Sequence, residues 1–297
     1  MRVGIVDVGA NTLRLLVASS EDDELQTIHE ERVQLGLGEE IEQTGEVGEQ
    51  KLREAEETAR AHVRRARKLG CTAIEVLVTS PGRQAENGGR LVSRLAAATA
   101  VRTRVLTSEE EAELAWRGAL NAAGHLPDTV AVCDVGGGSA QIAVGASWDT
   151  PSWSRSVNIG SLRLTRRVFQ NDPPDDDDLE RAQAAIALEF ADMTPPLPLT
   201  AIAVGGTARA LRRVVGDELD ADALRVAVKR LSKRSSKKIA KEFGVDGARA
   251  RTMTAGALIF AEIQRRLSIP LQVGRGGLRE GAALELIAEA EAAARSA

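Results

Sequence analysis

Two stretches of the sequence place an aspartate at the end of an apolar run and small residues directly after it. The first is VDVGANTLRLLV, with Asp7, and the second is CDVGGGSAQIAV, with Asp134. Glycine-rich backbone predicts phosphate binding at both places, because glycine permits positive φ and lets bare amides approach an anion closely. Since a carboxylate alone would repel phosphate, the pattern also predicts a divalent cation between them, for which Mg²⁺ with its waters is the expected choice.

The two stretches are copies of one pattern. Superposing the two aspartates pairs Thr12 with Ser139 and Arg14 with Gln141. A single glycine turn is typical of a tight β-hairpin, so neither copy alone identifies a phosphate site. The repetition of the aspartate at the matching place favours a duplicated phosphate clamp and predicts two similar domains.

A third glycine pair follows an apolar run in AIAVGGTARAL. Gly205, Gly206 and Thr207 stand where this run ends and a helical pattern begins. Bare amides and a helix N-terminus at the carboxyl end of a strand suit anions, although an ordinary strand-to-helix turn explains the same residues. The stretch is a candidate phosphate site with that alternative open.

The composition narrows the class of protein. The chain has 297 residues, 43% of them hydrophobic and 28% charged, and a formal net charge of −4. This length favours two domains, and the net charge argues against a general cationic field for nucleic acid. Only 2% of the residues are aromatic, which is poor material for stacking single-stranded bases. We therefore predict no nucleic-acid partner.

Signals of compartment and of metal ligands are sparse. Cys71 and Cys133 lie in apolar runs without a CxxC or Cys/His cluster, which predicts buried thiols in a reducing compartment. His29, His62 and His125 are scattered along the chain and predict no histidine site. No apolar stretch reaches the roughly 20 residues that span a bilayer, and an aspartate in the first apolar run disfavours a signal peptide. The expectation is a cytoplasmic protein without a membrane partner.

The hydrophobic pattern predicts strands that alternate with helices. The predicted strands are Val3–Val6, Leu13–Ser19, Ala73–Thr79, Arg104–Leu106, Val130–Cys133, Gln141–Gly145, Trp153–Asn158 and Ala201–Val204, with a further strand or loop at Arg32–Leu37. The predicted helices are Glu49–Leu69, Gly88–Thr99, Ser108–Ala123, Ser161–Val168, Asp178–Asp192 and one after Thr207. TSPGRQAEN is predicted to be a loop, and GHLPD, residues 124–128, a linker.

This order of elements predicts an α/β protein with mixed sheets. The expected domains are residues 1–123 and 128–297, and the last helix has the option of packing back on the first domain. Ligands of such proteins bind where loops at strand ends converge, so the two domains are expected to flank an interdomain cleft that holds the site.

The motifs, taken in order, resemble those of the exopolyphosphatase / guanosine pentaphosphatase family, within the superfamily of sugar kinases, heat-shock chaperones and actin. They are VDVGANTLRLLV, TSPGRQAEN, LTSEEEAELAWRGAL, DVGGGSAQ, NIGSLRLTRRVF, VGGT and GGLREG, and they span Arg2 to Gly281. The resemblance implies two ribonuclease-H-like domains of the actin-like ATPase superfamily. It also implies a Mg²⁺-dependent hydrolase that removes terminal phosphoryl groups from inorganic polyphosphate or from guanosine pentaphosphate.

The resemblance assigns roles to residues of this chain. Glu111 matches the catalytic base. Asp7 and Asp134 match metal-linked carboxylates, and Gln141 stands where the family has a glutamate that positions metal or water, so its contact with metal is expected through water. The expected phosphate-binding residues lie in the three glycine turns and in the arginine loop: Gly9, Asn11, Thr12, Arg14, Arg83, Gly136, Gly137, Gly138, Ser139, Gly205, Gly206 and Thr207.

Glu111 has a second explanation in helix physics. Ser108–Glu111 fits a capping box, in which a serine at the N-cap and a glutamate three residues later satisfy each other's backbone amides. The family resemblance favours the catalytic role, with Glu110 as the alternative base.

Two departures from the family pattern concern the turns. Gln141 replaces the usual glutamate and brings no negative charge, which predicts weaker Mg²⁺ binding and a slower enzyme. The competing view is that Gln141 is matched to its surroundings, for example by pairing with Arg14 across the cleft. Ala10 replaces the usual serine and removes one hydroxyl donor.

Two charge runs remain. VKRLSKRSSKKIAK, residues 228–241, carries seven basic residues and is either a solvated helix face or a track that guides a polyanion. Asp175–Asp178 follows two prolines and predicts an acidic helix start, which the helix dipole favours.

The preferred function is hydrolysis of inorganic polyphosphate from its end. Hydrolysis of guanosine pentaphosphate is the runner-up, and a weakly active sensor of polyphosphate or nucleotide is a third class that Gln141 makes conceivable. A sugar or acetate kinase is disfavoured, because Glu111 is placed to activate water. A homodimer is the expected assembly.

Overall fold

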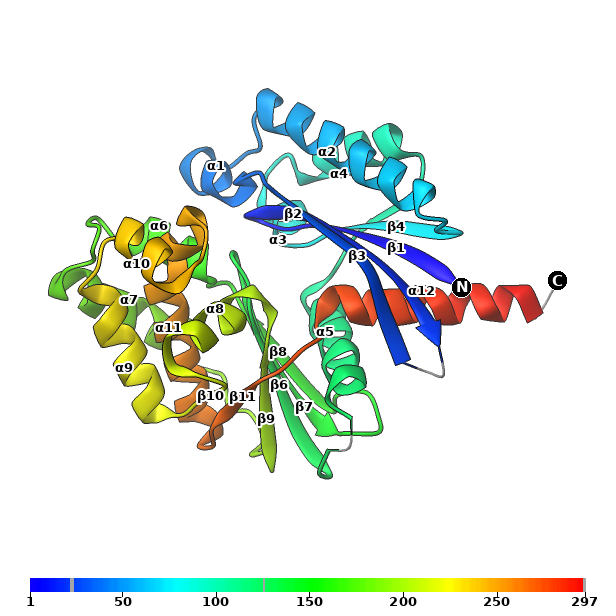
Figure 1. Cartoon of the computed structure of the whole chain (residues 1–297). Helices are drawn as coiled ribbons and strands as arrows, with labels where there is room; N and C mark the ends of the chain where they lie inside the picture. Colours follow the sequence, from blue (N-terminus) through cyan, green and yellow to red (C-terminus); the bar gives the residue numbers. More distant parts are fainter. Residues whose placement is uncertain (22–23, 125, 296–297) are drawn as a thin grey trace. The chain divides into compact units, whose positions relative to one another are not determined.

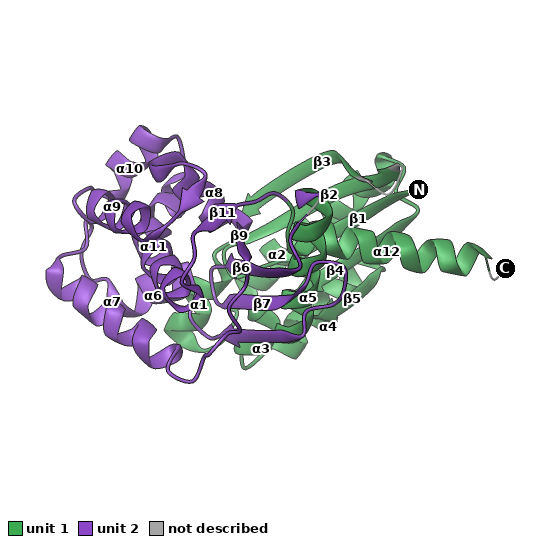
Figure 2. Ribbon diagram, turned by 90° about the horizontal axis from the view of Figure 1, so that it is seen from below, with its two compact units in different colours: residues 1–122, 276–297 green, residues 123–275 purple. Residues whose placement is uncertain are grey.

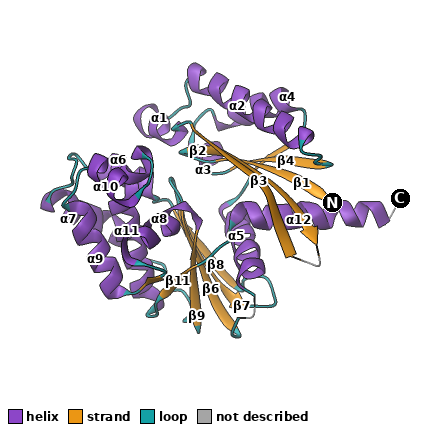
Figure 3. Cartoon of the chain, viewed as in Figure 1, coloured by secondary structure: helices purple, strands orange, loops and turns teal. Residues whose placement is uncertain are grey.

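The computed structural model describes residues 1–21, 24–124 and 126–295 (Figure 1). The chain divides into two compact units, unit 1 of residues 1–122 with 276–297, and unit 2 of residues 123–275 (Figure 2). The last helix, for which the sequence left two options, belongs to unit 1. Each unit combines a mixed sheet with helices (Figure 3), as the predicted α/β class requires.

Unit 1 contains a five-stranded sheet in the order β3-β2-β1-β4-β5. β1 pairs antiparallel with β2 and parallel with β4, so the sheet is mixed. The strands are β1 (Arg2–Val8), β2 (Thr12–Glu21), β3 (Glu24–Gln34), β4 (Ala73–Val78) and β5 (Arg102–Val105). The helices are α1 (Leu37–Thr44), α2 (Glu49–Lys68), α3 (Ser80–Gln84), α4 (Gly88–Thr99), α5 (Ser108–Ala123) and α12 (Leu278–Arg295).

The alternation of side chains along β1 gives this sheet two buried faces. Val6 and Val8 belong to the core that includes α2 and α4, whereas Val3 and Ile5 belong to the core that includes α5 and α12. Because successive side chains of a strand point to opposite faces, β1 serves both layers. α12 packs along β1, as Figure 1 also shows, and so brings the end of the chain onto the first sheet.

Unit 2 contains a six-stranded mixed sheet in the order β10-β11-β9-β6-β7-β8. The strands are β6 (Thr129–Val135), β7 (Ala140–Ala146), β8 (Trp153–Val157), β9 (Thr200–Val204), β10 (Glu218–Leu219) and β11 (Leu271–Val273). The helices are α6 (Ser161–Val168), α7 (Asp176–Glu189), α8 (Gly205–Val215), α9 (Ala221–Ser232), α10 (Ser236–Phe243) and α11 (Gly247–Leu267). The long helix α11 shares one core with β6 and β9.

Two segments of unit 1 differ from the prediction. The strand or loop predicted at 32–37 is confirmed up to residue 36, since residues 32–34 end β3. The sequence did not predict that β3 begins at Glu24 or that helix α1 begins at Leu37. TSPGRQAEN is predicted to be a loop, but it contains the short helix α3. Pro81 lies in the first turn of α3, where the missing amide hydrogen costs no helix bond. The proline was therefore a helix-start signal and not only a loop signal.

The basic run of unit 2 is not one helix. α9 ends at Ser232 and α10 begins at Ser236, so residues 228–241 present two short faces. Arg230 and Arg234 both form ion pairs with Glu242, at 3.0 and 2.7 Å. The single helix face is therefore wrong, and guidance of a polyanion by the remaining lysines stays a prediction.

Candidate active site

Each site aspartate lies opposite the residue that the sequence repeat pairs with it. On β1 and β2, Asp7 is the cross-strand partner of Arg14. On β6 and β7, Asp134 is the cross-strand partner of Gln141. The repeat read from the sequence is therefore a repeat of antiparallel register, once in each unit.

Both turns close with the same backbone hydrogen bond. The Gly9 amide donates to the Thr12 carbonyl at 3.0 Å, and the Gly136 amide donates to the Ser139 carbonyl at 3.0 Å. Residues 136–138 are not among the described residues with positive φ, so this glycine run does not use the left-handed backbone that glycine permits. Its glycines instead allow neighbouring backbone to approach the turn closely.

Helix α6 orients the second turn. Its first amides hold the carbonyls of Gly136 and Gly137 at 2.9–3.0 Å. In a planar trans peptide the N–H points opposite to the C=O, so the amides of Gly137 and Gly138 point away from α6. Gly160 permits this packing, because a Cβ there would lie 2.5 Å from the Gly137 carbonyl. Two neighbouring amides are thus aimed as an anion site requires.

Residues 35–38 orient the first turn in a similar way. The Gly38 amide donates to the Ala10 carbonyl at 2.6 Å, and two further amides of the segment donate to the Asn11 carbonyl at 3.0 Å. By the same peptide geometry, the amides of Asn11 and Thr12 point away from the segment. This support includes the start of α1, the helix that the sequence prediction missed.

The turn hydroxyls have equivalent partners in the two units. Arg14 Nε donates to Thr12 Oγ1 at 3.1 Å, and Gln141 Nε2 donates to Ser139 Oγ at 2.8 Å. Each hydroxyl oxygen accepts a hydrogen bond, so its own proton can go to a ligand oxygen. Gln141, which is buried, also donates to Ser156 Oγ at 3.4 Å. Gln141 therefore makes the contact that Arg14 makes in the other turn.

The third glycine turn contacts the second aspartate. Gly205 has a φ of 84°, and a Cβ on it would lie 2.1 Å from Asp134 Oδ1. Thr207 Oγ1 donates to the Val135 carbonyl at 2.6 Å and accepts from Arg249 Nη1 at 3.1 Å. The Thr207 hydroxyl thus orients the end of β6. Because its proton goes to the Val135 carbonyl, the hydroxyl does not donate to a phosphate, and the phosphate contact predicted for Thr207 would have to use the backbone amide.

The first aspartate lies among charged groups. Asp7 is partly exposed, yet its pKa is raised, chiefly by desolvation; Arg14 and then Arg279 lower the pKa in part, and Glu280 raises it. Arg279 is buried and its guanidinium lies 2.9 Å from Glu30. A carboxylate that is costly to ionise among cations is typical of a functional site.

Arg249 and Arg279 were absent from the predicted site. Arg279 belongs to GGLREG, one of the motifs that resemble the family, but the resemblance assigns no role to this arginine. Arg249 lies two residues before Arg251, and no spacing distinguishes it from that neighbour. Both reach their turns only because α11 and α12 pack beside them, which a local pattern does not reveal.

The structure brings Glu111 and Arg83 together. Glu111 is 5% exposed, and Arg83 Nη2 donates to its Oε2 at 2.9 Å. Arg83 Nη1 donates to the Leu106 carbonyl just before α5. α3 and the start of α5 thus place a guanidinium against a buried carboxylate within unit 1.

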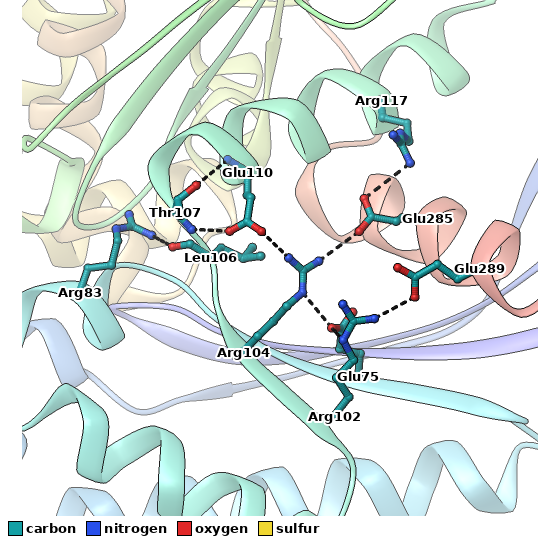
Figure 4. A network of polar contacts seen from close by, with 10 residues as sticks. All are labelled: Glu75, Arg83, Arg102, Arg104, Leu106, Thr107, Glu110, Arg117, Glu285 and Glu289. Carbon is teal, nitrogen blue, oxygen red and sulfur yellow. Dashed lines mark hydrogen bonds and ion pairs between the residues drawn. The ribbon is translucent and has the colours of Figure 1, made fainter.

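The capping box lies one residue earlier than predicted. Thr107 N donates to Glu110 Oε2 at 2.7 Å, and Glu110 N donates to Thr107 Oγ1 at 3.1 Å (Figure 4). The box expected from Ser108 to Glu111 is therefore wrong. LTSEEE contains two overlapping frames of Thr or Ser with a glutamate three residues later. The helix uses the first frame, which leaves Glu111 for another role.

Each turn carboxylate, taken within its own unit, suits a hydrated divalent cation. Within the described ranges, no group of three or more His, Cys, Asp or Glu is placed to hold a metal. Asp7 and Asp134 instead offer one carboxylate in each unit. That donor set suits Mg²⁺, which keeps several waters and takes further oxygens from substrate phosphates.

The paired histidines His29 and His62 and the two cysteines have surroundings that indicate structural roles. His29 Nε2 and His62 Nδ1 lie 3.5 and 3.9 Å from the same Glu31 oxygen, so these two are not scattered in space. Burial lowers the pKa of His62. Cys133 is buried as expected, whereas Cys71 is only partly buried, and its pKa is raised to about 11 by desolvation.

Three further expectations concern α7, His125 and membranes. The acidic helix start is confirmed, because Asp175 caps α7 and forms a capping box with Asp178. His125 lies outside the described residues. In the part of the chain that the structure describes, every helix is too short or too polar to cross a membrane.

The chain is an α/β protein of two mixed-sheet units, each with an aspartate next to the end of its first strand, as the sequence predicts. The model of the Ppx/GppA phosphatase family matches residues 16–290, and the chain belongs to that family. The family is one of phosphatases, and phosphatases are hydrolases.

Relatives and solved structures agree with this family. Exopolyphosphatase 1 of Mycobacterium tuberculosis is 28% identical over 313 residues, which cover 99% of this chain and 91% of the relative. Exopolyphosphatase 2 of the same organism is 28% identical over 294 residues, 90% of this chain and 91% of the relative. The crystal structure of the Aquifex aeolicus family member has a TM-score of 0.82 at 24% identity and covers 97% of this chain and 98% of that one. An exopolyphosphatase structure from Cytophaga hutchinsonii has a TM-score of 0.85 at 22% identity, covering 95% and 96%. At these identities the two structures establish the fold alone.

Proposed function

We propose that this protein hydrolyses terminal phosphoryl groups of inorganic polyphosphate. The observation that carries the proposal is the buried Glu111 carboxylate, held at 2.9 Å by Arg83, beside a glutamate that the helix cap already occupies. Membership of a phosphatase family and relatives named exopolyphosphatase support it. Water attacks the terminal phosphorus and the phosphoanhydride bond breaks. The terminal phosphoryl group becomes orthophosphate, and the chain shortened by one unit is the leaving group.

Glu111 is the general base of this mechanism. Within unit 1, Arg83 binds the Glu111 carboxylate. Phosphate oxygens compete for this guanidinium, because arginine and phosphate form strong charge-assisted pairs. When Arg83 turns to the substrate, the Glu111 carboxylate gives up the Arg83 hydrogen bond and accepts the proton of the attacking water.

The turns bind phosphoryl oxygens through backbone and hydroxyl donors. In unit 2 these donors are the amides of Gly137 and Gly138 and the hydroxyl of Ser139. Mg²⁺, where Asp7 or Asp134 holds it, would supply neutralisation of phosphate charge. Phosphoryl transfer needs mostly positioning and charge neutralisation, and these donors provide both.

The test is phosphate release by the wild-type protein from long-chain polyphosphate, guanosine pentaphosphate and ATP at one Mg²⁺ concentration. The proposal predicts the largest kcat/KM for polyphosphate. A larger kcat/KM for guanosine pentaphosphate would mean that guanosine pentaphosphate, and not polyphosphate, is the preferred substrate. Tight polyphosphate binding without release would indicate a sensor.

The length of the polyphosphate substrate provides a separate test of whether the lysines of residues 228–241 guide a polyanion. Reversing Lys233, Lys237, Lys238 and Lys241 to Glu should weaken long polyphosphate more than tripolyphosphate if these residues guide a polyanion. The difference should shrink with added salt, because exposed charges are screened. Equal effects on both substrates would identify a solvated surface.

A further inference from the structure

Three consecutive glutamates at the start of α5 have three different surroundings. Glu109 is exposed. Glu110 uses Oε2 to cap Thr107 N and Oε1 to accept from Arg104 Nη1 at 2.7 Å. Glu111 is buried against Arg83. The residue directly before the proposed base is thus bound through both carboxylate oxygens.

Arg104 holds Glu110 from a fixed position. Its guanidinium also donates from Nε to Glu75 Oε1 at 2.9 Å and from Nη2 to Glu285 Oε1 at 3.2 Å (Figure 4). Glu75 is 3% exposed, so its charge needs this partner. The three carboxylates come from β4, α5 and α12, and a single planar guanidinium therefore ties three elements together.

We propose that Arg104 is a positioning residue for the base. It orients Glu110, the Glu110 cap fixes where α5 begins, and the first turn of α5 then presents Glu111 to Arg83 and to the attacking water. The proposal rests on the proposed function of Glu111. A shift of about 1 Å in a catalytic group can cost roughly 10²-fold in rate. A helix start held by an arginine that is itself anchored on the buried Glu75 therefore has catalytic value.

The chain offers a matched control two residues away. Arg102 lies on the same strand and pairs with the same Glu75 at 3.1 Å, and with Glu289 of α12 at 2.8 Å. It thus ties β5 to β4 and α12, as Arg104 does, while its ion pairs go to Glu75 and Glu289 and not to Glu110. A purely structural role of this network predicts similar consequences of removing either arginine. A positioning role singles out Arg104.

The experiment compares kcat and KM on polyphosphate for Arg104→Gln, Arg102→Gln, Glu110→Ala and the double variant Arg104→Gln/Glu110→Ala. Arg104→Gln should lower kcat about tenfold with KM nearly unchanged, because substrate-binding groups are untouched. Arg102→Gln should keep kcat within about twofold. In the Glu110→Ala background, Arg104→Gln should cost almost nothing more, because residues that act through one contact are not additive.

Equal kcat losses in the two arginine variants, or full additivity with Glu110→Ala, would overturn the proposal. If Arg104→Gln does not fold, Glu110→Gln replaces it. That variant retains an acceptor for the Thr107 amide but loses the charge that Arg104 binds, and a smaller loss of kcat at constant KM is expected.

Hydrogen exchange separates failure of this proposal from failure of the proposed function. The amides of Glu110 and Glu111 donate to Thr107, at 3.1 and 3.0 Å. They should exchange faster in Arg104→Gln than in Arg102→Gln, whatever the substrate of the enzyme. A wild-type protein inactive on polyphosphate refutes the function, and unchanged exchange in Arg104→Gln refutes the positioning role.

Discussion

The turn after Asp7 and the turn after Asp134 share their backbone but differ in charge. Both have the same cross-strand register and the same closing hydrogen bond. In the first turn the donor to the hydroxyl is Arg14, and in the second it is Gln141. A duplicated fold has thus kept one hydrogen-bond geometry with two different electrostatic environments.

The difference teaches that the two repeats, each taken by itself, offer a ligand different groups. Unit 1 contains the charged chemistry: Glu111, Arg83 and the aspartate whose pKa Arg14 and Arg279 lower in part. Unit 2 offers neutral donors around Asp134, with helix α6 fixing the glycine run. We expect changes in unit 2 to act on phosphate binding and changes around Glu111 to act on the chemical step.

The largest expected effect within the turns comes from Gly160→Ala. Its φ of −125° suits alanine, but the new Cβ would lie 2.5 Å from the Gly137 carbonyl and must displace the turn. We predict about a 10²-fold loss of kcat/KM for polyphosphate. Gly89→Ala is the control, because a Cβ there has no atom within 4 Å. Equal activity of the two variants would show that α6 does not set the turn.

A smaller effect is expected from Gln141→Glu. A carboxylate can only accept, so Ser139 would turn its proton toward it and no longer donate to phosphate. We predict about a tenfold higher KM, the order of one charge-assisted hydrogen bond, with no lower Mg²⁺ requirement. Ser156→Ala, which removes a second hydrogen-bond partner of Gln141, should change KM little. A lower Mg²⁺ requirement with faster turnover would restore the view that a missing charge limits this enzyme.

The smallest expected effect is on stability, and it concerns Asp7→Asn. The pKa of Asp7 is raised in the folded protein above the ordinary value of 3.8, chiefly by desolvation. Ionisation therefore opposes folding, and this cost appears as pH rises above the unfolded value and is complete above the folded pKa. Asp7→Asn should unfold at higher urea concentration than wild type near neutral pH, and should lose this advantage below pH 3.8.

The control for Asp7→Asn is Asp222→Asn. Asp222 has a side chain that is 82% exposed and pairs with Arg225 on the surface of α9. Its substitution should give no gain in urea midpoint. A gain of the same size in both variants, or a destabilised Asp7→Asn, would contradict the assignment of a desolvation cost to the first turn.

The sequence predicts the parts of this site that are local. Apolar alternation locates β1, β2, β6 and β7, and the repeated Asp-Val-Gly locates both turns. The capping box was misplaced by one residue, because LTSEEE fits two frames. The frame in use contains Glu110, which is contacted by Arg104, a residue of β5. Helix α1 was missed because its start depends on a left-handed Gly36 and on contacts with the first turn. Arg249 and Arg279 could not be assigned, since tertiary packing alone brings them to residues far away in the chain.

The most direct test of the account compares Glu111→Gln with Glu110→Gln, measuring polyphosphate hydrolysis and polyphosphate binding for both. Glu111→Gln should lose about 10²–10⁴ in kcat, as removal of a general base does, while binding persists. Glu110→Gln retains an acceptor for the Thr107 amide and should lose about tenfold at most. A Glu111→Gln variant near wild-type activity beside an inactive Glu110→Gln would contradict the assignment of the base.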